Sequence, residues 1–523
     1  MRYGTRGFGL FLLVTAAITG AVVMAVEVLG SRVIGPYFGV SLFVWTALIA
    51  VTLLALAAGY LAGGVWADRF RSPTALYVFI AGAGLWLLLV PLLRQAVLPA
   101  MLPLGLRWGA LASAAILFGP ALFLLGCVSP WLVRLAASEW ARLGSTVGRL
   151  YAVSTAGSFA GTLLTGYYLI VEWGVARAFQ FGGVLLIGLG AAYAALFLRR
   201  SVFLALPLAA AAAAMWPGGL PSATMPDGTR VRVIDSRDSF YGNVRVVEYA
   251  GRAGRTRELV IDGLVQGGID VDSGQSVYEY GYVLESLIAQ ARPGVRRCLV
   301  IGLGPGVMPA RLAARGIATE VVDIDPAVVA AARRHFDLPA AIPVHLADAR
   351  HFIETSAERY DAIVLDVFNG DTTPSHLLSR EALQALKARL NRDGVVAINL
   401  VAALGRESIG SAALLRTIRA VFPWVRVHPV GDASGGEGIA NLAVIAGLGA
   451  APAPDARPAG IEVPRQMAGQ VAQALLRTLP VPDPSHGLVL TDDFNPYDFL
   501  DLPLKEAVRR HILENTPAAI LLL

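Results

Sequence analysis

The sequence predicts three parts: a multi-span α-helical membrane domain, a small antiparallel β-sheet, and an α/β Rossmann-like domain with a doubly wound parallel sheet. The chain of 523 residues is 55% hydrophobic and only 15% charged, and its charges are sparse before about residue 226. Short alternating runs follow, and strand-like segments then alternate with helix-like segments. We therefore expect a membrane domain at 1–220, a small β-sheet with one helix at 226–290, and a ligand-binding doubly wound domain with a closing C-terminal segment at 291–523.

The membrane prediction depends on charge-free windows of about 20 residues, the length that crosses a bilayer. A seventh apolar run, 201–216, is shorter and rich in alanine, so six or seven helices are expected. The glycines of GSFAG (Gly157 to Gly161) share one helix face, which favours close helix–helix packing. The six longer windows are 8–26, 41–66, 73–93, 108–133, 150–171 and 178–198.

Several classes of function find no support in the composition. The formal net charge is +5, and no run of Lys and Arg marks a nucleic-acid surface, so no nucleic-acid partner is expected. No His/Cys cluster has metal-ligand spacing, and no metal is expected. The two cysteines, Cys127 and Cys298, lie in separate apolar runs, which predicts buried thiols rather than a disulfide.

The small sheet is predicted from three alternating runs between residues 229 and 268. They read RVRVIDS, NVRVVEYA and RELVIDGLVQ, and turn residues separate them. Beyond residue 296 we expect strands joined by helices, with WVRVHPV and NLAVIAG completing one edge of the sheet. The expected strands are 297–301, 319–323, 342–346, 361–366 and 394–400.

A glycine-rich turn follows the first of these strands. Gly302, Gly304 and Gly306 would let the backbone approach a ligand closely. The spacing is G-x-G-x-G, and Val307 stands where a dinucleotide-binding fingerprint has its third glycine. This departure counts against NAD or FAD.

Acids end the next three strands in order. In a doubly wound sheet, ligands bind beyond the carboxyl ends of the strands, so these acids should meet in one crevice. Asp323 is placed for ribose hydroxyls, Asp348 for an adenine amino group, and Asp366 faces the same crevice. The constellation favours an S-adenosyl-type nucleoside and hence a sheet of the S-adenosylmethionine-methyltransferase type; a fold without a ligand stays the lesser alternative.

With these residues, the soluble half resembles the spermidine synthase (polyamine aminopropyltransferase) family over about residues 229 to 430. SFYGNVRVVE, LVIDGLVQ and SVYEYGYVLESL are similar to its motifs, and the nucleoside loop follows at the expected place. The whole chain resembles bacterial membrane proteins in which several spans precede such a domain. Those also carry segments like EVLGSRVIGPYFG, GRLYAVSTAGSFAG and TDDFNP.

The resemblance implies attack of an amine on the aminopropyl carbon of decarboxylated S-adenosylmethionine. Asp366 matches the catalytic aspartate, which would accept the amine proton. Gln266 and Tyr278 would line the aminopropyl and amine pocket, while Asp323 would hold the ribose and Asp348 the adenine. A homodimer is also implied.

Some positions depart from the family pattern. Pro305 replaces the acid of the glycine loop, which in the family selects the decarboxylated cofactor. Asn369 stands where a second acid follows the catalytic one, with Asp371 two residues further, and Glu279 replaces a histidine after the pocket tyrosine. Both the decarboxylated form of the cofactor and a simple diamine acceptor are therefore in question.

Four further side chains have two interpretations each. Asp371 and His376 either bind substrate or cap the helix that starts near Ser379. Asp492 and Asp493 in LTDDFNP either close over the amine or simply form a turn.

Three functions remain open at this point. The first is a membrane-tethered aminopropyltransferase acting on a polyamine-like amine. The second is an S-adenosylmethionine-dependent methyltransferase with an amphiphilic acceptor, and the third is a transporter or sensor that binds a nucleoside without turnover. The lipid bilayer and a small-molecule amine are the expected partners.

The orientation of the membrane domain is predicted from its arginines. They cluster in alternate loops, which the positive-inside rule places in the cytoplasm together with the N-terminus. Six spans would return the chain to the cytoplasm at Arg199, so we expect a multi-pass protein of a bacterial-type inner membrane with a cytoplasmic catalytic domain. A seventh span at 201–216 would place that domain outside.

Overall fold

The computed structural model describes two compact units, one of helices and one that begins near residue 220 and contains both sheets. The small sheet lies in the same compact unit as the doubly wound sheet, and the predicted division into three domains stays a prediction. The structure describes residues 6–515 apart from 40–41, 71, 137–142, 215–221, 253, 369–372, 405–408, 432–437, 454, 456 and 458.

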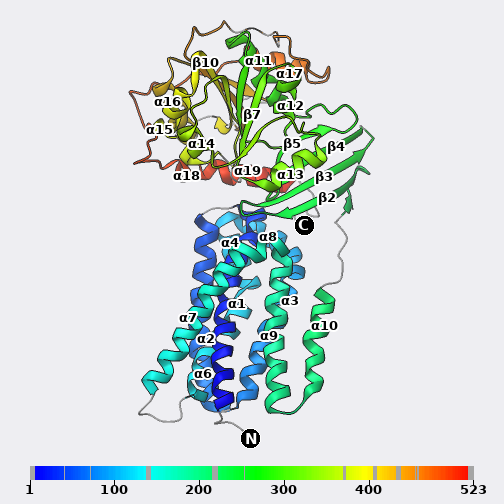
Figure 1. Ribbon diagram of the computed structural model, residues 1–523, viewed down its shortest axis with the longest axis vertical. Helices are drawn as coiled ribbons and strands as arrows, with labels where there is room; N and C mark the ends of the chain where they lie inside the picture. The colour runs from blue at the N-terminus through cyan, green and yellow to red at the C-terminus, as the bar shows by residue number, and fades with distance from the viewer. Residues whose placement is uncertain are drawn as a thin grey trace. The chain divides into compact units, whose positions relative to one another are not determined.

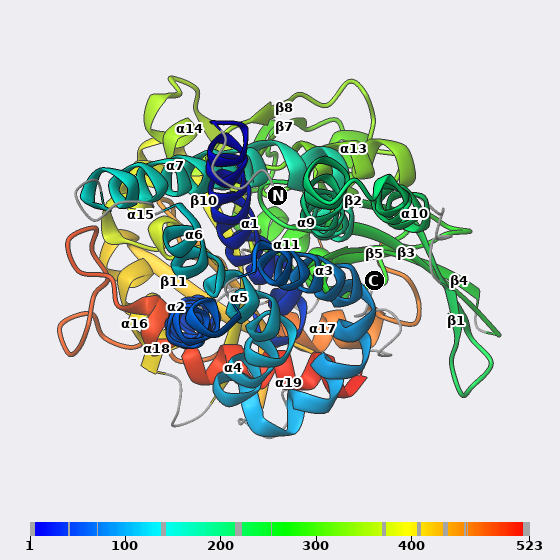
Figure 2. The ribbon, with the colours of Figure 1, turned by 90° about the horizontal axis from the view of Figure 1, so that it is seen from below.

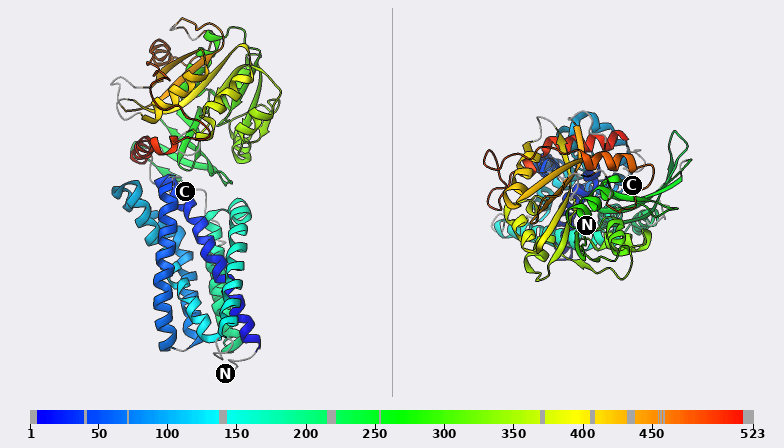
Figure 3. Two further views of the ribbon diagram at one scale, coloured as in Figure 1. Left: turned by 90° about the vertical axis from the view of Figure 1, so that its left-hand side faces the viewer. Right: turned by 90° about the horizontal axis from the view of Figure 1, so that it is seen from above.

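The first unit is a bundle of long apolar helices (Figure 3, left). A π-helical turn, Thr165–Leu169, joins α7 to α8, and short 3-10 turns precede α4 and α10. Its helices are α1 (Arg6–Phe38), α2 (Leu42–Phe70), α3 (Pro73–Met101), α4 (Gly105–Leu117), α5 (Gly119–Gly126), α6 (Val128–Ala136), α7 (Leu143–Leu164), α8 (Ile170–Trp173), α9 (Val175–Phe197) and α10 (Ala205–Ala214).

Among the described residues, five helical stretches are long and apolar enough to cross a membrane, judged by length and composition only. Leu54 and Leu61 on α2 are 73% and 77% exposed, which leaves a broad apolar surface. The sequence predicts six longer windows; Leu143–Leu164 is helical but is not among the five, and Ser201–Ala213 is a shorter apolar helix. The number of spans stays a prediction. The five stretches are Gly7–Phe38, Phe43–Phe70, Pro73–Leu117, Gly119–Ala136 and Val175–Phe197.

Helix α7 packs against α1 (Figure 2), and the glycines of GSFAG allow the two helices to approach closely. A Cβ on Gly157 would lie 2.1 Å from the carbonyl oxygen of Ala17, and one on Gly161 would lie 2.5 Å from that of Ala21. The two backbones approach so closely that no side chain larger than hydrogen fits. The packing interpretation of this motif is confirmed.

The small sheet of the second unit is antiparallel, as predicted, with strand order β1-β2-β3-β4-β5 in the described residues. A bulge between Leu259 and Val260 shifts the register of β4 against β5. The strands are β1 (Ser222–Thr224), β2 (Arg230–Asp238), β3 (Asn243–Gly251), β4 (Gly254–Ile261) and β5 (Leu264–Asp270).

The larger sheet has the order β11-β12-β10-β9-β6-β7-β8. Its strands are parallel except β12, which is antiparallel to both neighbours. The chain runs from β6 outward through β7 to β8, then returns to β9 on the other side of β6, so the switch point lies between β6 and β9. The strands are β6 (Arg297–Ile301), β7 (Ala318–Asp323), β8 (Val344–Leu346), β9 (Tyr360–Leu365), β10 (Leu390–Leu404), β11 (Trp424–Val430) and β12 (Gly438–Gly447).

Helices cover both faces of this sheet (Figure 1). Alternate residues of β6 serve two cores: Cys298 and Val300 pack with α11, α12, α13 and α17, whereas Leu299 and Ile301 pack with α14, α15 and α16. Both Cys127 and Cys298 are free and buried, as predicted. The helices are α11 (Glu279–Ala291), α12 (Val307–Ala314), α13 (Pro326–His335), α14 (Ala349–Thr355), α15 (Arg380–Ala388), α16 (Ile409–Val421), α17 (Ala468–Leu476), α18 (Tyr497–Leu500) and α19 (Leu502–Asn515).

Candidate active site

The glycine-rich turn and Asp366 lie side by side at the switch point. Gly302 follows β6 with φ +90°, and its N–H donates to the carbonyl of Val322 at 2.9 Å. A Cβ on Gly302 would lie 2.0 Å from the carbonyl oxygen of Asp366, which follows β9. The first glycine is therefore required by the neighbouring backbone, whatever the ligand.

The rest of the turn contacts the small sheet. Gly304 and Gly306 also have positive φ, +52° and +79°, and Gly306 immediately precedes α12. A Cβ on Gly267 of β5 would lie 2.9 Å from Cγ of Pro305, and one on Gly304 would lie 3.4 Å from the carbonyl oxygen of Gln266. Gln266 thus lies on the strand that borders the turn, and its side-chain amide donates to the carbonyl of Leu264 at 3.4 Å.

Asp323 ends β7 and braces the turn. One carboxylate oxygen accepts the backbone N–H of Leu303 at 2.8 Å, and the other accepts that of Asp325 at 2.8 Å. Burial raises the pKa of Asp323 to about 6, although these hydrogen bonds lower it. The two bonds fix the direction of the carboxylate and leave further lone pairs for a ligand.

Asp366 is held by two neutral donors. The side-chain amide of Asn399, on β10, donates to its carboxylate at 2.9 Å, and the hydroxyl of Tyr280, in the first turn of α11, donates to it as well. Burial raises the pKa of Asp366 to about 6, while the two hydrogen bonds lower it. Such a group is mostly ionised at pH 7 and can still accept a proton.

The tyrosine on Asp366 is not the one that the sequence predicts for the pocket. Tyr278 precedes α11 with an extended backbone, and its hydroxyl donates to the carboxylate of Glu258 at 2.7 Å. Tyr280, two residues on, is the tyrosine that contacts Asp366. Glu279 begins α11, and its carboxylate points toward Gly431.

Asp348 caps α14 at the edge of the crevice. Its carboxylate accepts the N–H of His351 at 2.9 Å, and its second oxygen lies 3.3 Å from Nε2 of His376. Ser379 caps α15 by accepting the N–H of Ala382, so His376 does not form this cap. Asn369 and Asp371 lie outside the described residues.

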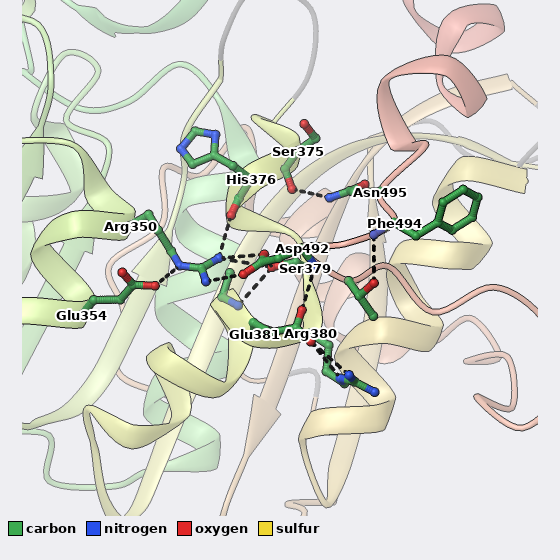
Figure 4. Close-up of polar contacts among 12 residues, drawn as sticks. Arg350, Glu354, Ser375, His376, Ser379, Arg380, Glu381, Asp492, Phe494 and Asn495 are labelled. Carbon is green, nitrogen blue, oxygen red and sulfur yellow. Dashed lines mark hydrogen bonds and ion pairs between the residues drawn. The ribbon is translucent and has the colours of Figure 1, made fainter.

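Asp492 anchors the C-terminal segment (Figure 4). The Arg350 guanidinium lies between Glu354 and Asp492, with 2.7 Å to the latter, and the Ser379 hydroxyl donates to Asp492 at 2.5 Å. These contacts hold the pKa of Asp492 below its usual range. Asp492, for which the sequence leaves open closure over the amine or a simple turn, thus contacts residues of α14 and the cap of α15, while Asp493 beside it is exposed.

Sequence similarity covers this same crevice. Residues 280–426 match the spermine/spermidine synthase domain. The chain is 43% identical over 135 residues to an N-terminal histidine N-methyltransferase of Emericella nidulans, covering 25% of this chain and 24% of that protein. It is 39% identical over 114 residues to a polyamine aminopropyltransferase of Vibrio vulnificus, covering 20% of this chain and 38% of that protein.

A solved structure is also similar. A probable spermidine synthase from Corynebacterium glutamicum aligns with a TM-score of 0.37 and 19% identity, covering 41% of this chain and 79% of that one. The chain spans about a quarter and two fifths of the lengths of the two curated relatives. Residues 280–426 are therefore similar to the spermine/spermidine synthase domain, and this part of the chain is similar to both kinds of transferase.

Sequence reasoning missed two side chains that donate to Asp366. Asn399 is a lone polar residue in the apolar run VVAINLV, and this interruption was a usable signal. Tyr280 is one of several tyrosines in YEYGY and has no local feature that singles it out.

Proposed function

We propose that the second unit is an aminopropyltransferase of the spermidine synthase type. It would move the aminopropyl group of decarboxylated S-adenosylmethionine to a polyamine-like amine. The observation that carries the proposal is Asp366, a partly buried carboxylate at the switch point, held by Tyr280 and Asn399 directly beside the glycine turn. The match of residues 280–426 to the spermine/spermidine synthase domain includes all these elements of the crevice.

The proposed chemistry assigns Asp366 the role of base. A free amine has a pKa near 10 and arrives protonated, so a proton must leave its nitrogen. Asp366 accepts that proton, the nitrogen forms a bond to the aminopropyl carbon, and the carbon–sulfur bond breaks with its electron pair going to sulfur. The leaving group is then neutral methylthioadenosine. Because Tyr280 and Asn399 fix the carboxylate, it also orients the amine for in-line attack.

The nucleoside would be held by the strand-end acids. Asp323 is braced by two backbone N–H groups and would receive the ribose hydroxyls on its remaining lone pairs. Asp348 would accept a hydrogen bond from the adenine amino group, and Gln266 would line the pocket of the aminopropyl group. The N-terminus of α12 after Gly306 supplies backbone N–H groups toward the same side.

A methyltransferase is the second candidate, favoured by two observations. The glycine turn carries Pro305, which packs on Gly267 and provides no acid to recognise a decarboxylated cofactor. The similarity to a histidine N-methyltransferase also covers a quarter of the chain. In this case S-adenosylmethionine would donate a methyl group to an amine of an amphiphilic acceptor.

The first unit would anchor the enzyme in a bacterial-type inner membrane. Five apolar helical stretches of the described residues and the exposed leucines of α2 support this proposal. A bilayer location would give the catalytic unit access to an acceptor or product that lies in, or crosses, the membrane.

Product analysis tests the proposal. Detergent-purified protein is incubated with putrescine or spermidine and either form of S-adenosylmethionine, with Asp366→Asn as the control. Mass spectrometry should find methylthioadenosine from the decarboxylated form only, and none with the variant. S-adenosylhomocysteine would instead establish the methyltransferase, and no turnover of either form would contradict both candidates.

A further inference from the structure

The C-terminal segment 490–498 is hydrogen-bonded to the start of α15 and to the short turn before it (Figure 4). The carbonyl of Leu490 accepts the N–H of Arg380 at 2.8 Å. Further along, the side-chain amide of Asn495 donates to the carbonyl of Ser375 at 2.8 Å. The segment is therefore fixed at two places to the stretch of chain that leads from the crevice into α15.

Arg350 on α14 connects this segment to the proposed nucleoside site. Its guanidinium makes two hydrogen bonds to the Asp492 carboxylate, at 2.7 and 3.2 Å, and such paired bonds fix direction as well as distance. The same guanidinium donates to the backbone carbonyl of His376 at 3.1 Å. Asp492 therefore holds the Arg350 side chain, and Arg350 holds the backbone at His376.

Arg350 acts on Asp348 in two ways. It lies in the first turn of the helix that Asp348 caps, and it binds the backbone of the histidine whose side chain contacts Asp348. One Asp348 oxygen accepts the N–H of His351 at 2.9 Å, and the other lies 3.3 Å from Nε2 of His376. An ionised carboxylate only accepts, so Nε2 of His376 is the donor in this contact. The two contacts set the direction of a carboxylate that is 40% exposed and hence open to a ligand.

The direction of the Asp348 carboxylate decides which purine it favours. The amino group at position 6 of adenine donates N–H, whereas the oxygen at position 6 of hypoxanthine only accepts and would face the carboxylate without a hydrogen bond. A hydrogen bond weakens steeply when it is bent, so the preference for adenine depends on a carboxylate that is held in place.

We propose that Asp492 is a positioning residue of the nucleoside site. Through Arg350 and His376 it holds the Asp348 carboxylate in the direction that accepts the adenine amino group, and the C-terminal segment thereby sets the preference for adenine over 6-oxopurine nucleosides. This role rests on the proposed function only in assigning a nucleoside to the crevice, and it requires no group transfer.

The test measures binding of two nucleosides to full-length protein in detergent by isothermal titration calorimetry. Methylthioadenosine carries the amino group, and methylthioinosine is its 6-oxo analogue. Asp492→Asn keeps the shape of the side chain but removes the charge that holds Arg350. The affinity for methylthioadenosine should fall about tenfold, the lower end of the value of a hydrogen bond to a charged group, while that for methylthioinosine should stay within about twofold. Asp483→Asn, an exposed acid that bonds only to nearby Ser485, is the matched control.

Two further variants separate positioning from a general loss of structure. The His376 side chain is 54% exposed, so His376→Ala should fold, and it should lower the affinity for methylthioadenosine alone. In a double-mutant cycle, adding Asp492→Asn to Asp348→Asn should cause no further loss of methylthioadenosine affinity, because both changes act through one carboxylate. Equal losses for the two nucleosides, or independent losses that multiply in the double variant, would overturn the proposal.

The outcomes distinguish this inference from the proposed reaction. If the wild type prefers methylthioadenosine but transfers no group to any amine, the proposed function fails and the role of Asp492 still stands. If the wild type transfers aminopropyl groups and Asp492→Asn keeps the preference for methylthioadenosine, this inference alone falls. A wild type that binds the two nucleosides equally, or binds neither, also overturns it.

Discussion

The pH dependence of the proposed transfer should report the state of Asp366. Burial raises its pKa to about 6, from an ordinary value of 3.8. A carboxyl with a raised pKa stays protonated to a higher pH, and a protonated carboxyl cannot accept the amine proton. We therefore expect kcat/KM for the amine to be lost as the pH falls through about 6, about tenfold for each further pH unit.

Tyr280→Phe is the perturbation that tests this cause. Its hydroxyl donates to the ionised carboxylate and lowers the pKa of Asp366, so its loss should raise that pKa further. A hydrogen bond to a charged group is worth about 1.5–3 kcal/mol, and one pKa unit corresponds to about 1.4 kcal/mol. The acid limb should therefore move upward by about one to two pH units, to about pH 7–8.

The assay measures initial rates of methylthioadenosine formation between about pH 5 and pH 9. The nucleoside is kept saturating, because burial also raises the pKa of Asp323 to about 6 and its titration would enter the profile otherwise. Tyr282→Phe is the control, since this tyrosine lies on the same helix but donates to the carbonyl of Ser276 at 3.1 Å. An acid limb near pH 4, or one that Tyr280→Phe leaves in place, would refute the reasoning.

Three further predictions concern the turn, the bundle and the nucleoside. Gly302→Ala should lower the melting temperature far more than Gly316→Ala, because both have positive φ but only Gly302 has a carbonyl oxygen 2.0 Å from the added Cβ. Gly316→Ala should lower the free energy of unfolding by about 1–2 kcal/mol, the cost of its positive φ. Equal shifts in melting temperature would contradict the close approach at Gly302. Gly157→Leu should destabilise the detergent-solubilised bundle, whereas Gly148→Leu, with open space around it, should not, as measured by thermal unfolding. Asp323→Ala should weaken methylthioadenosine binding about ten- to a hundredfold in calorimetry, and an unchanged affinity would remove Asp323 from the nucleoside site.

Much of the fold could be predicted because its signals are local. The alternation of RVRVIDS and NVRVVEYA gives the antiparallel strands, and buried apolar runs such as RCLVI give the parallel ones. The predicted edge strands WVRVHPV and NLAVIAG are β11 and β12. Asp323 and Asp366 lie at the strand ends where the pattern places them, because the end of a parallel strand is itself the edge of the crevice.

The site was less accessible to sequence reasoning because its contacts join distant segments. The partner of Asp492 is Arg350, 142 residues earlier, and no local pattern indicates that this ion pair closes the C-terminal segment onto α14. Gly267 of β5 meets Pro305 of the glycine turn only because the small sheet folds against that turn. Such pairings exist only once the chain has folded.

The sequence by itself determined the kinds of element, their order, and the acids and glycines at the strand ends, since each follows from side chains within one or two turns of chain. Only the tertiary structure decided which tyrosine donates a hydrogen bond to Asp366. Tyr278 and Tyr280 are two residues apart, and α11 begins between them, so one is extended and the other helical. The packing of α11 against the sheet sets where the helix starts. This change of backbone conformation turns the Tyr278 hydroxyl toward Glu258 and the Tyr280 hydroxyl toward Asp366.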